Sequence, residues 1–276
     1  MVSAFTPQNI SAFGPLVLMA IMYQLVGLLC TLIVREVVYV PRDFRWGIIV
    51  MGVISNWGNL PTAVVQTMAK ESPFDPSTDV DLGVAYIAIF ILIMNTTFFA
   101  LGVHKICGWD FMDDHMLEDP IPFKERWRRR AANATSFYGR LRGKNKSVVT
   151  EDPELPPSPV LSQVTTTAVP SRWRDLPLMA IVSMTVIKMI IVPVFAIFVV
   201  QALQKHTSLF PPAQKIRTFV VILLSGTPAA ANQLVVTQLL NPAGTAHTLA
   251  SFLLLQYALM FILSTALAAI ALYIVK

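Results

Sequence analysis

The chain has 276 residues, of which 55% are hydrophobic and only 13% are charged. A soluble globular protein carries about 25% charged residues, so this composition argues against a soluble domain. The net charge of +5 does not indicate nucleic-acid binding, because the excess of Lys and Arg lies in segments that flank apolar runs. The first residues lack the basic region of a signal peptide, so we expect the first apolar run to be retained.

Six long apolar runs follow one another along the chain. A helix needs roughly 20 residues to cross a hydrocarbon core of about 30 Å. Five runs contain no Asp, Glu, Lys or Arg, and the fourth contains a single one, Lys188. The alternative is a set of buried helices in a large soluble protein, and the short polar connections argue against it. The sequence predicts an all-α integral membrane protein with six transmembrane helices at 13–34, 46–69, 82–103, 176–203, 218–240 and 248–275.

The connection 105–175 differs from the other connections in length and composition. It carries two basic runs, 124–130 and 140–146, and a tract rich in Pro, Ser and Thr at 151–171. Low hydrophobicity and many prolines predict a largely disordered tether. Its basic runs either serve topology alone or also bind anionic lipid. The predicted organisation is a short N-terminal segment, a first three-helix repeat, this loop and a second three-helix repeat, at 1–12, 13–104, 105–175 and 176–276.

The distribution of Lys and Arg predicts the orientation in the membrane, because positive loops stay on the cytosolic side. The loops 35–45 and 104–175 together carry 15 of these residues, whereas the segments on the opposite side carry five. We therefore expect the long loop in the cytosol and both termini on the other side.

Each set of three helices enters the membrane from the opposite side to the other set, which is the condition for an inverted repeat. The middle run of each set is interrupted by Gly and Pro, in SNWGNLP (55–61) and in SGTPAAANQ (225–233). Proline removes a backbone donor, and glycine loosens the same stretch. Irregular backbone survives in a membrane only inside protein or beside a water-filled cavity. The sequence predicts two inverted three-helix repeats, each with a broken middle helix.

The interruptions carry the predicted substrate site. Two half-helix N-termini meeting at mid-membrane would offer partial positive charge and free N–H groups, which suit an anion. Amide side chains at the same places add hydrogen-bond donors without a buried charge. Two ordinary proline kinks, with the amides bonded across helices, are the alternative. The candidate residues at the interruptions are Asn56, Asn59, Pro61, Pro228, Asn232 and Gln233.

Lys188 completes the candidate site. A central Lys costs about 2.5–3.5 kcal/mol on insertion scales, and such residues usually mark a pathway or a partner. Lys188 could offset the charge of an anionic substrate or lose its proton within a transport cycle. The structural alternative is a Lys held by carbonyl groups that Pro193 frees.

Neither an enzyme nor a cofactor is predicted. The chain has no Gly-rich phosphate loop and no nucleophile motif. A polar cluster follows the third run, but its spacing matches no standard metal site, so no metal is expected. The residues of that cluster are His104, Cys107, Asp113, Asp114 and His115.

The interrupted runs and their neighbours resemble the auxin efflux carrier superfamily, most closely its PIN-like branch with the fungal members. The resemblance runs through VPRDFRWGIIVMGVISNWGNLPTAVV (40–65), ESPFD (71–75), GVAYIAIF (83–90), VIKMIIVP (186–193) and GTPAAANQLVVTQLL (226–240). It implies an elevator-type carrier of auxin-like weak acids, in the endoplasmic reticulum, whose substrate binds where broken helices cross. By this resemblance the positions that match the crossing are Asn56, Asn59, Pro61, Pro228 and Asn232.

The family has ten helices, five in each half, whereas the six runs here match the last three of each half. In family terms these six form the mobile transport domain, and the scaffold helices are missing, so the chain resembles a truncated member. The resemblance thus implies a homodimer or pairing with a full-length relative. A non-transporting or regulatory fragment and a channel are the alternatives to a carrier of small organic anions.

Overall fold

The computed structural model describes residues 7–112 and 177–276, which belong to one compact unit. The first stretch contains α1 (Pro7–Val37), the 3-10 turn η2 (Arg42–Phe44), α2 (Gly47–Val53), α3 (Asn59–Met68), α4 (Asp79–Asn95), the π-helical turn η3 (Thr96–Ala100) and the 3-10 segment η4 (Val103–Phe111). The second stretch contains α7 (Leu178–Val186), the π-helical turn η6 (Ile187–Ile191), α8 (Val192–His206), α9 (Lys215–Ser225), α10 (Asn232–Leu240) and α11 (His247–Val275).

Four helical spans in the described part are long and apolar enough to cross a membrane. They cover Ser11–Val37, Asp79–Ala100, Leu178–His206 and His247–Val275. These spans correspond to the first, third, fourth and sixth predicted runs, with ends that move by a few residues. The second of these spans ends at Ala100 because Gly102 adopts a positive φ of 76°, a left-handed conformation that commonly terminates a helix.

The second and fifth predicted runs are not continuous helices. Each consists of two short helices, α2 with α3 and α9 with α10, and the break between them falls where Gly and Pro predicted it. The longest of these four helices has 11 residues, too few to cross a bilayer alone. The described part therefore has four membrane-spanning candidates and two broken helices.

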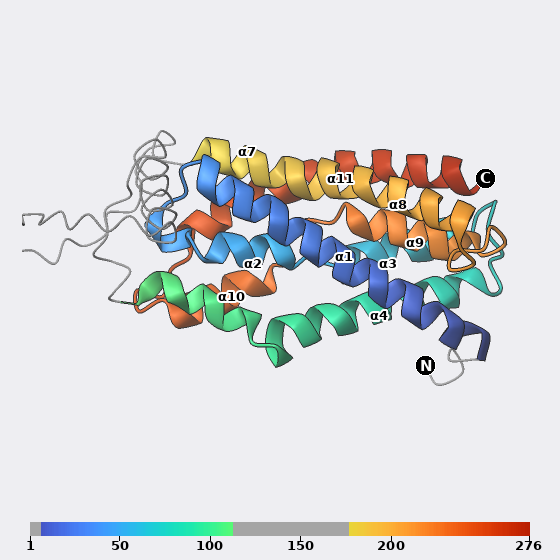
Figure 1. The fold of residues 1–276 in the computed structure, drawn as a ribbon, viewed down its shortest axis with the longest axis horizontal. Coiled ribbons are helices and arrows are strands. Elements are labelled where there is room, and N and C mark those ends of the chain that lie inside the picture. The colour runs from blue at the N-terminus through green and yellow to red at the C-terminus, as the bar shows by residue number, and fades with distance from the viewer. Residues whose placement is uncertain (1–6, 113–176) are drawn as a thin grey trace, which may run out of the picture. The chain divides into compact units, whose positions relative to one another are not determined.

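The first halves of the two broken helices, α2 and α9, lie at the centre of the fold (Figure 1). α9 is buried from Ile216 to Ser225, and α2 is buried from Gly47 to Gly52. α1 packs against α2 and α4, and α11 packs against α9 and α7. The long apolar helices thus surround the interruptions and remove them from lipid, as irregular backbone in a membrane requires.

α1 and α2 approach each other through small residues. A Cβ atom added at Gly27 would overlap the carbonyl oxygen of Gly52, and one added at Gly52 would overlap the Thr31 hydroxyl. Small residues allow this kind of close contact between membrane helices. The contact holds the first half of the broken helix α2–α3 against α1.

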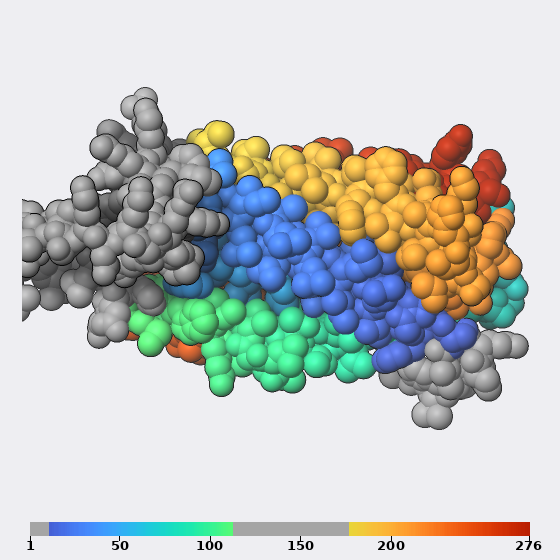
Figure 2. All heavy atoms as spheres, in the orientation of Figure 1, coloured from blue at the N-terminus to red at the C-terminus, as the bar shows by residue number. Residues whose placement is uncertain are grey.

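The outer surface of the long helices is apolar. α1, α4 and α7–α8 form one face of the unit (Figure 2), and large apolar side chains on them are exposed, with Ile33 at 63% and Phe198 at 67%. Such surface suits contact with lipid or with other apolar helices.

The first residues of the predicted loop 105–175 are ordered. η4 packs against α2 and α10, and it buries Cys107 and Asp110. The sequence predicted a largely disordered tether from residue 105 onward. The structure instead packs η4 into the core through these two buried side chains. The remainder of the loop, with Asp113, Asp114 and His115, lies outside the described residues.

Candidate functional site

The two interruptions pair with each other. We call the segments 54–58 and 226–231 the crossing. Ser55 and Ala229 form an antiparallel bridge, with hydrogen bonds from Asn56 N to Pro228 O at 2.8 Å and from Ala230 N to Ile54 O at 3.4 Å. Each break therefore supplies partners for backbone groups that the other break leaves without a helical partner.

Two helix N-termini lie next to the crossing. α3 begins at Asn59, directly after one interruption, and α10 begins at Asn232, directly after the other. α3 packs against α9, and α10 packs against α2, so the two N-termini approach the crossing from opposite sides (Figure 1). Each carries about half a positive charge, although N–H groups of the first turn of α10 already donate to Ala230 O and Ala231 O.

Asn56 connects the crossing to α11. Its Nδ2 donates to the hydroxyl of Tyr257 at 2.7 Å, and that hydroxyl donates to Ala229 O at 3.2 Å. Its Oδ1 accepts from Gly58 N at 3.3 Å. The neighbouring Gln256 is fully buried and accepts from Ala229 N at 2.8 Å. Sequence reasoning missed Gln256 and Tyr257, although a polar pair in the middle of an apolar run was the available signal.

Trp57 anchors the first interruption. Its side chain is 1% exposed, and its Nε1 donates to Leu224 O at 3.0 Å. Its ring packs edge-on against Phe90 of α4, with centroids 5.0 Å apart. The indole thus satisfies a carbonyl group near the end of α9 and positions the crossing against α4.

Lys188 reaches the crossing from another helix. The side chain is 2% exposed, and Nζ donates to Ser55 Oγ at 2.8 Å and to Ile54 O at 3.4 Å. Both acceptors lie at the first interruption, so the groups that hold Lys188 differ from the carbonyl groups that Pro193 frees. Among residues 7–112 and 177–276, no carboxylate forms an ion pair with Lys188. The buried amino group of Lys188 therefore lies at the crossing.

The other predicted residues occupy three different environments. Asn59 and Asn232 are exposed, and within the described part neither side chain forms a hydrogen bond. Pro61 and Pro228 are buried on opposite walls of a small cavity. Gln233 is fully buried and turns away from the crossing, because its Nε2 donates to Gly47 O at 2.7 Å. The structure brings Asn56, Pro228 and Lys188 together and directs Gln233 to the start of α2.

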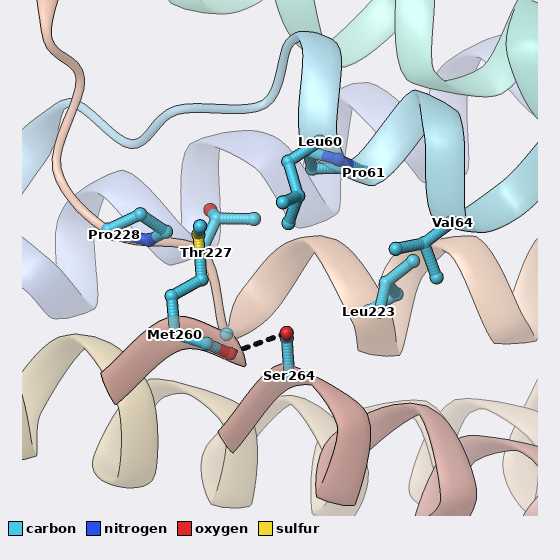
Figure 3. A pocket seen from close by; sticks show the side chains of 9 residues that line it. Leu60, Pro61, Val64, Leu223, Thr227, Pro228, Met260 and Ser264 are labelled. Carbon is cyan, nitrogen blue, oxygen red and sulfur yellow. Dashed lines mark hydrogen bonds between the residues drawn. The ribbon is translucent and has the colours of Figure 1, made fainter. Parts of the chain in front are cut away.

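The cavity between α3, α9 and α11 is very small (Figure 3). It has a volume of about 10 Å³ and lies between Pro61, Pro228 and Met260. A single buried water needs roughly this volume, so no organic molecule fits in the conformation described. Access by a larger ligand requires these helices to separate.

A second polar cluster lies at the start of α2. Asp110 of η4 is 3% exposed and accepts hydrogen bonds from Trp46 N and Gly47 N, both at 2.7 Å. These N–H groups belong to the N-terminus of α2, which has no helical partner for them. Burial raises the pKa of Asp110 to about 7, although both hydrogen bonds favour the ionised form. Sequence reasoning missed Asp110, because its partners lie 63 and 64 residues away.

Comparison with known proteins gives one relative. A Saccharomyces cerevisiae (strain ATCC 204508 / S288c) protein, described as uncharacterized transporter YLR152C, is 32% identical over 112 residues. The match covers 41% of this chain and 19% of the yeast protein, so the chain accounts for a minor part of that relative's length. No family model and no solved structure matches the chain. The four apolar spans and this relative together identify a multi-pass membrane protein that is related to a transporter.

Proposed function

We propose that this protein is a secondary carrier for small organic anions of the auxin-like weak-acid type. The observation that carries the proposal is the crossing itself, where two broken helices pair and Lys188 adds a buried charge. Irregular backbone at membrane depth, inside a shell of apolar helices, is typical of substrate sites in secondary transporters. The yeast relative described as a transporter supports the same class of function.

The chemistry of the crossing favours an anion. The N-termini of α3 and α10 and the ammonium group of Lys188 all contribute positive potential. Within the described residues no acidic side chain pairs with this charge. The free amides of Asn59 and Asn232 lie in the first turns of the two half-helices, where they would donate to a carboxylate. The proposed substrate site comprises Asn56, Asn59, Pro61, Lys188, Pro228, Asn232 and Gln233, with Gln233 acting through α2.

The proposed architecture is an inverted repeat. α1, α2–α3 and α4 form one set, and α7–α8, α9–α10 and α11 form the other, each with its broken helix in the middle. The antiparallel bridge between Ser55 and Ala229 lies where a two-fold axis relating the two sets would pass. Such symmetry supports alternating access, because the two sets can exchange their conformations. The small cavity at the crossing fits a closed state in that cycle.

The proposed location is an intracellular membrane, that of the endoplasmic reticulum, with the long loop in the cytosol. Asn133 and Asn145, outside the described residues, each begin an Asn-X-Ser/Thr acceptor pattern. On the cytosolic side neither would be glycosylated. Treatment of the expressed protein with an endoglycosidase tests this orientation, and a mobility shift that depends on either residue overturns it.

The transport proposal is tested by reconstitution. Purified protein in liposomes should take up radiolabelled indole-3-acetate saturably, and a double Asn59→Ala/Asn232→Ala variant should lose most of that uptake. Linear uptake without saturation would indicate a channel instead. Uptake that appears only with a full-length relative in the same liposomes would indicate a fragment that does not transport alone. The exposed apolar faces of α1 and α8 provide surface for such pairing or for a homodimer.

A further inference from the structure

A second buried cation, Arg217, lies in the first turn of α9, at the end far from the crossing. Its side chain is 2% exposed, and Nη1 donates to Leu209 O at 2.9 Å. Its Nε and Nη2 atoms are buried and have no hydrogen-bond partner in the described part of the chain. From Arg217 to the interruption at Gly226, α9 rises about 13 Å, so this cation is separate from the proposed substrate site.

The surroundings of Arg217 do not neutralise it. The ring of Tyr86 on α4 lies 5.9 Å from the guanidinium carbon, near the outer limit of a cation–π contact. The one ion pair in the described part joins Arg35 to Glu36. A buried charge without a partner is unfavourable, so this position calls for a negative group.

The helix end adds positive charge of its own. Lys215 and Arg217 both lie in the first turn of α9, which contains no acidic residue. The N-terminus of a helix carries about half a positive charge, so basic residues are disfavoured here and an anion is favoured.

The two free donors of Arg217 define the kind of ligand. Nε and Nη2 form one edge of the planar guanidinium group, and their N–H bonds point in the same direction. This edge binds two oxygen atoms of a carboxylate or phosphate in parallel. We propose that Arg217 binds an oxyanion through its Nε–Nη2 edge, at a second site formed by the N-terminus of α9 and Tyr86 of α4. Because the edge has no exposed surface here, binding displaces a covering side chain.

Two sources could supply this oxyanion, a lipid headgroup or a small soluble anion, and two arms of one experiment distinguish them. In the first arm, native mass spectrometry measures retention of phosphatidylserine against phosphatidylcholine by the purified protein. In the second arm, thermal melting in phosphatidylcholine nanodiscs is followed against increasing inorganic phosphate or benzoate, at constant ionic strength set with chloride.

Three variants test whether the Nε–Nη2 edge of Arg217 binds the anion. Arg217→Gln should weaken binding of the effective anion about tenfold or more, because two charge-assisted hydrogen bonds are lost. Arg217→Lys should retain part of the affinity, since it keeps the positive charge but lacks the two parallel N–H donors of the guanidinium edge. Lys215→Gln is the matched control, because it removes one charge from the same turn, and it should change the affinity less than about threefold.

The outcomes decide the proposal without any transport measurement. Selective retention of phosphatidylserine by the wild type, but not by Arg217→Gln, supports the lipid source, and stabilisation by phosphate or benzoate supports the soluble source. The proposal is overturned if no anion binds the wild type more tightly than Arg217→Gln. If Arg217→Gln does not fold, equal anion responses of Arg217→Lys and the wild type overturn it equally well. Since the readout is binding at α9, loss of indole-3-acetate uptake would leave this result unaffected.

Discussion

Lys188 and Arg217 are two basic residues that are each only 2% exposed, yet their surroundings differ. The ammonium of Lys188 has two acceptors, Ser55 Oγ and Ile54 O, supplied by the interruption of another helix. The guanidinium of Arg217 has one carbonyl acceptor, and two of its nitrogen atoms remain without a partner. The comparison teaches that the interruption supplies two acceptors to Lys188, whereas the irregular segment before α9 supplies a single acceptor, Leu209 O, to Arg217.

A further contrast follows for ligands. At the crossing an anion would join a cation that already has partners, so the fold does not depend on the ligand. At α9 the anion would accept hydrogen bonds from the unpartnered nitrogen atoms of Arg217. Anion binding should therefore raise the stability of the folded protein. The predictions below test this difference, from the largest expected effect to the smallest.

Substitution of Lys188 should have the largest effect on substrate binding. Lys188→Met removes the buried charge at the crossing, and we expect binding of indole-3-acetate to fall about a hundredfold, as for a lost partner of a buried charge pair. Lys188→Arg should keep part of the affinity. Scintillation proximity binding to purified protein measures both variants. Lys205→Met, at the exposed end of α8, is the control, and equal affinities of Lys188→Met and the wild type would leave Lys188 a purely structural role.

Asp110 extends the comparison to a buried carboxyl group, whose effect should appear in the pH dependence of stability. The pKa of Asp110 rises from 3.8 to about 7 on folding, so the folded state binds this proton more tightly than the unfolded chain. Stability from this group is therefore fully present below about pH 4 and is lost as the pH rises through 7. The melting temperature of the wild type should fall between pH 5 and 8 relative to that of Asp110→Asn. Parallel melting curves for the two proteins over this range would contradict the prediction.

The two exposed amides should act on one ligand. Asn59→Ala and Asn232→Ala should each weaken anion binding by about 1–3 kcal/mol, the usual cost of a lost hydrogen bond to a charged group. Because both would contact the same anion, the double variant should depart from the sum of the single changes. A double-mutant cycle on benzoate binding measures this coupling. Strict additivity in a folded protein would show that the two helix ends do not share a site.

The smallest effect is expected at Tyr257, whose hydroxyl joins Asn56 to the carbonyl of Ala229. Tyr257→Phe removes that link and leaves the apolar ring in place. We expect a loss of about 0.5–1.5 kcal/mol in unfolding free energy, measured by denaturant titration in detergent. Tyr273→Phe is the matched control, because Tyr273 is 83% exposed, and its variant should melt like the wild type. Equal unfolding free energies of Tyr257→Phe and Tyr273→Phe would show that the Tyr257 hydroxyl does not stabilise the crossing.

Several features of the fold could be predicted from the sequence because they depend on local signals. Long stretches without charge indicate helices that suit a membrane, and residues 7–112 and 177–276 contain four such spans. Gly and Pro within the second and fifth runs indicated breaks, since these residues act on their own backbone and the preceding turn. Lys188 stood out because it is the single charge in its run. Whether the candidate residues bind a substrate stays a prediction.

Tertiary structure alone decided which groups meet. Lys188 pairs with Ser55 across 133 residues, and Asn56 pairs with Tyr257 across 201. Gln233 follows Asn232 directly, yet it faces α2 and Asn232 is exposed, because neighbours on a helix point in directions about 100° apart. Composition and spacing specify where a helix breaks, but the partner of a broken segment depends on how distant helices pack, and no local signal in the chain records that.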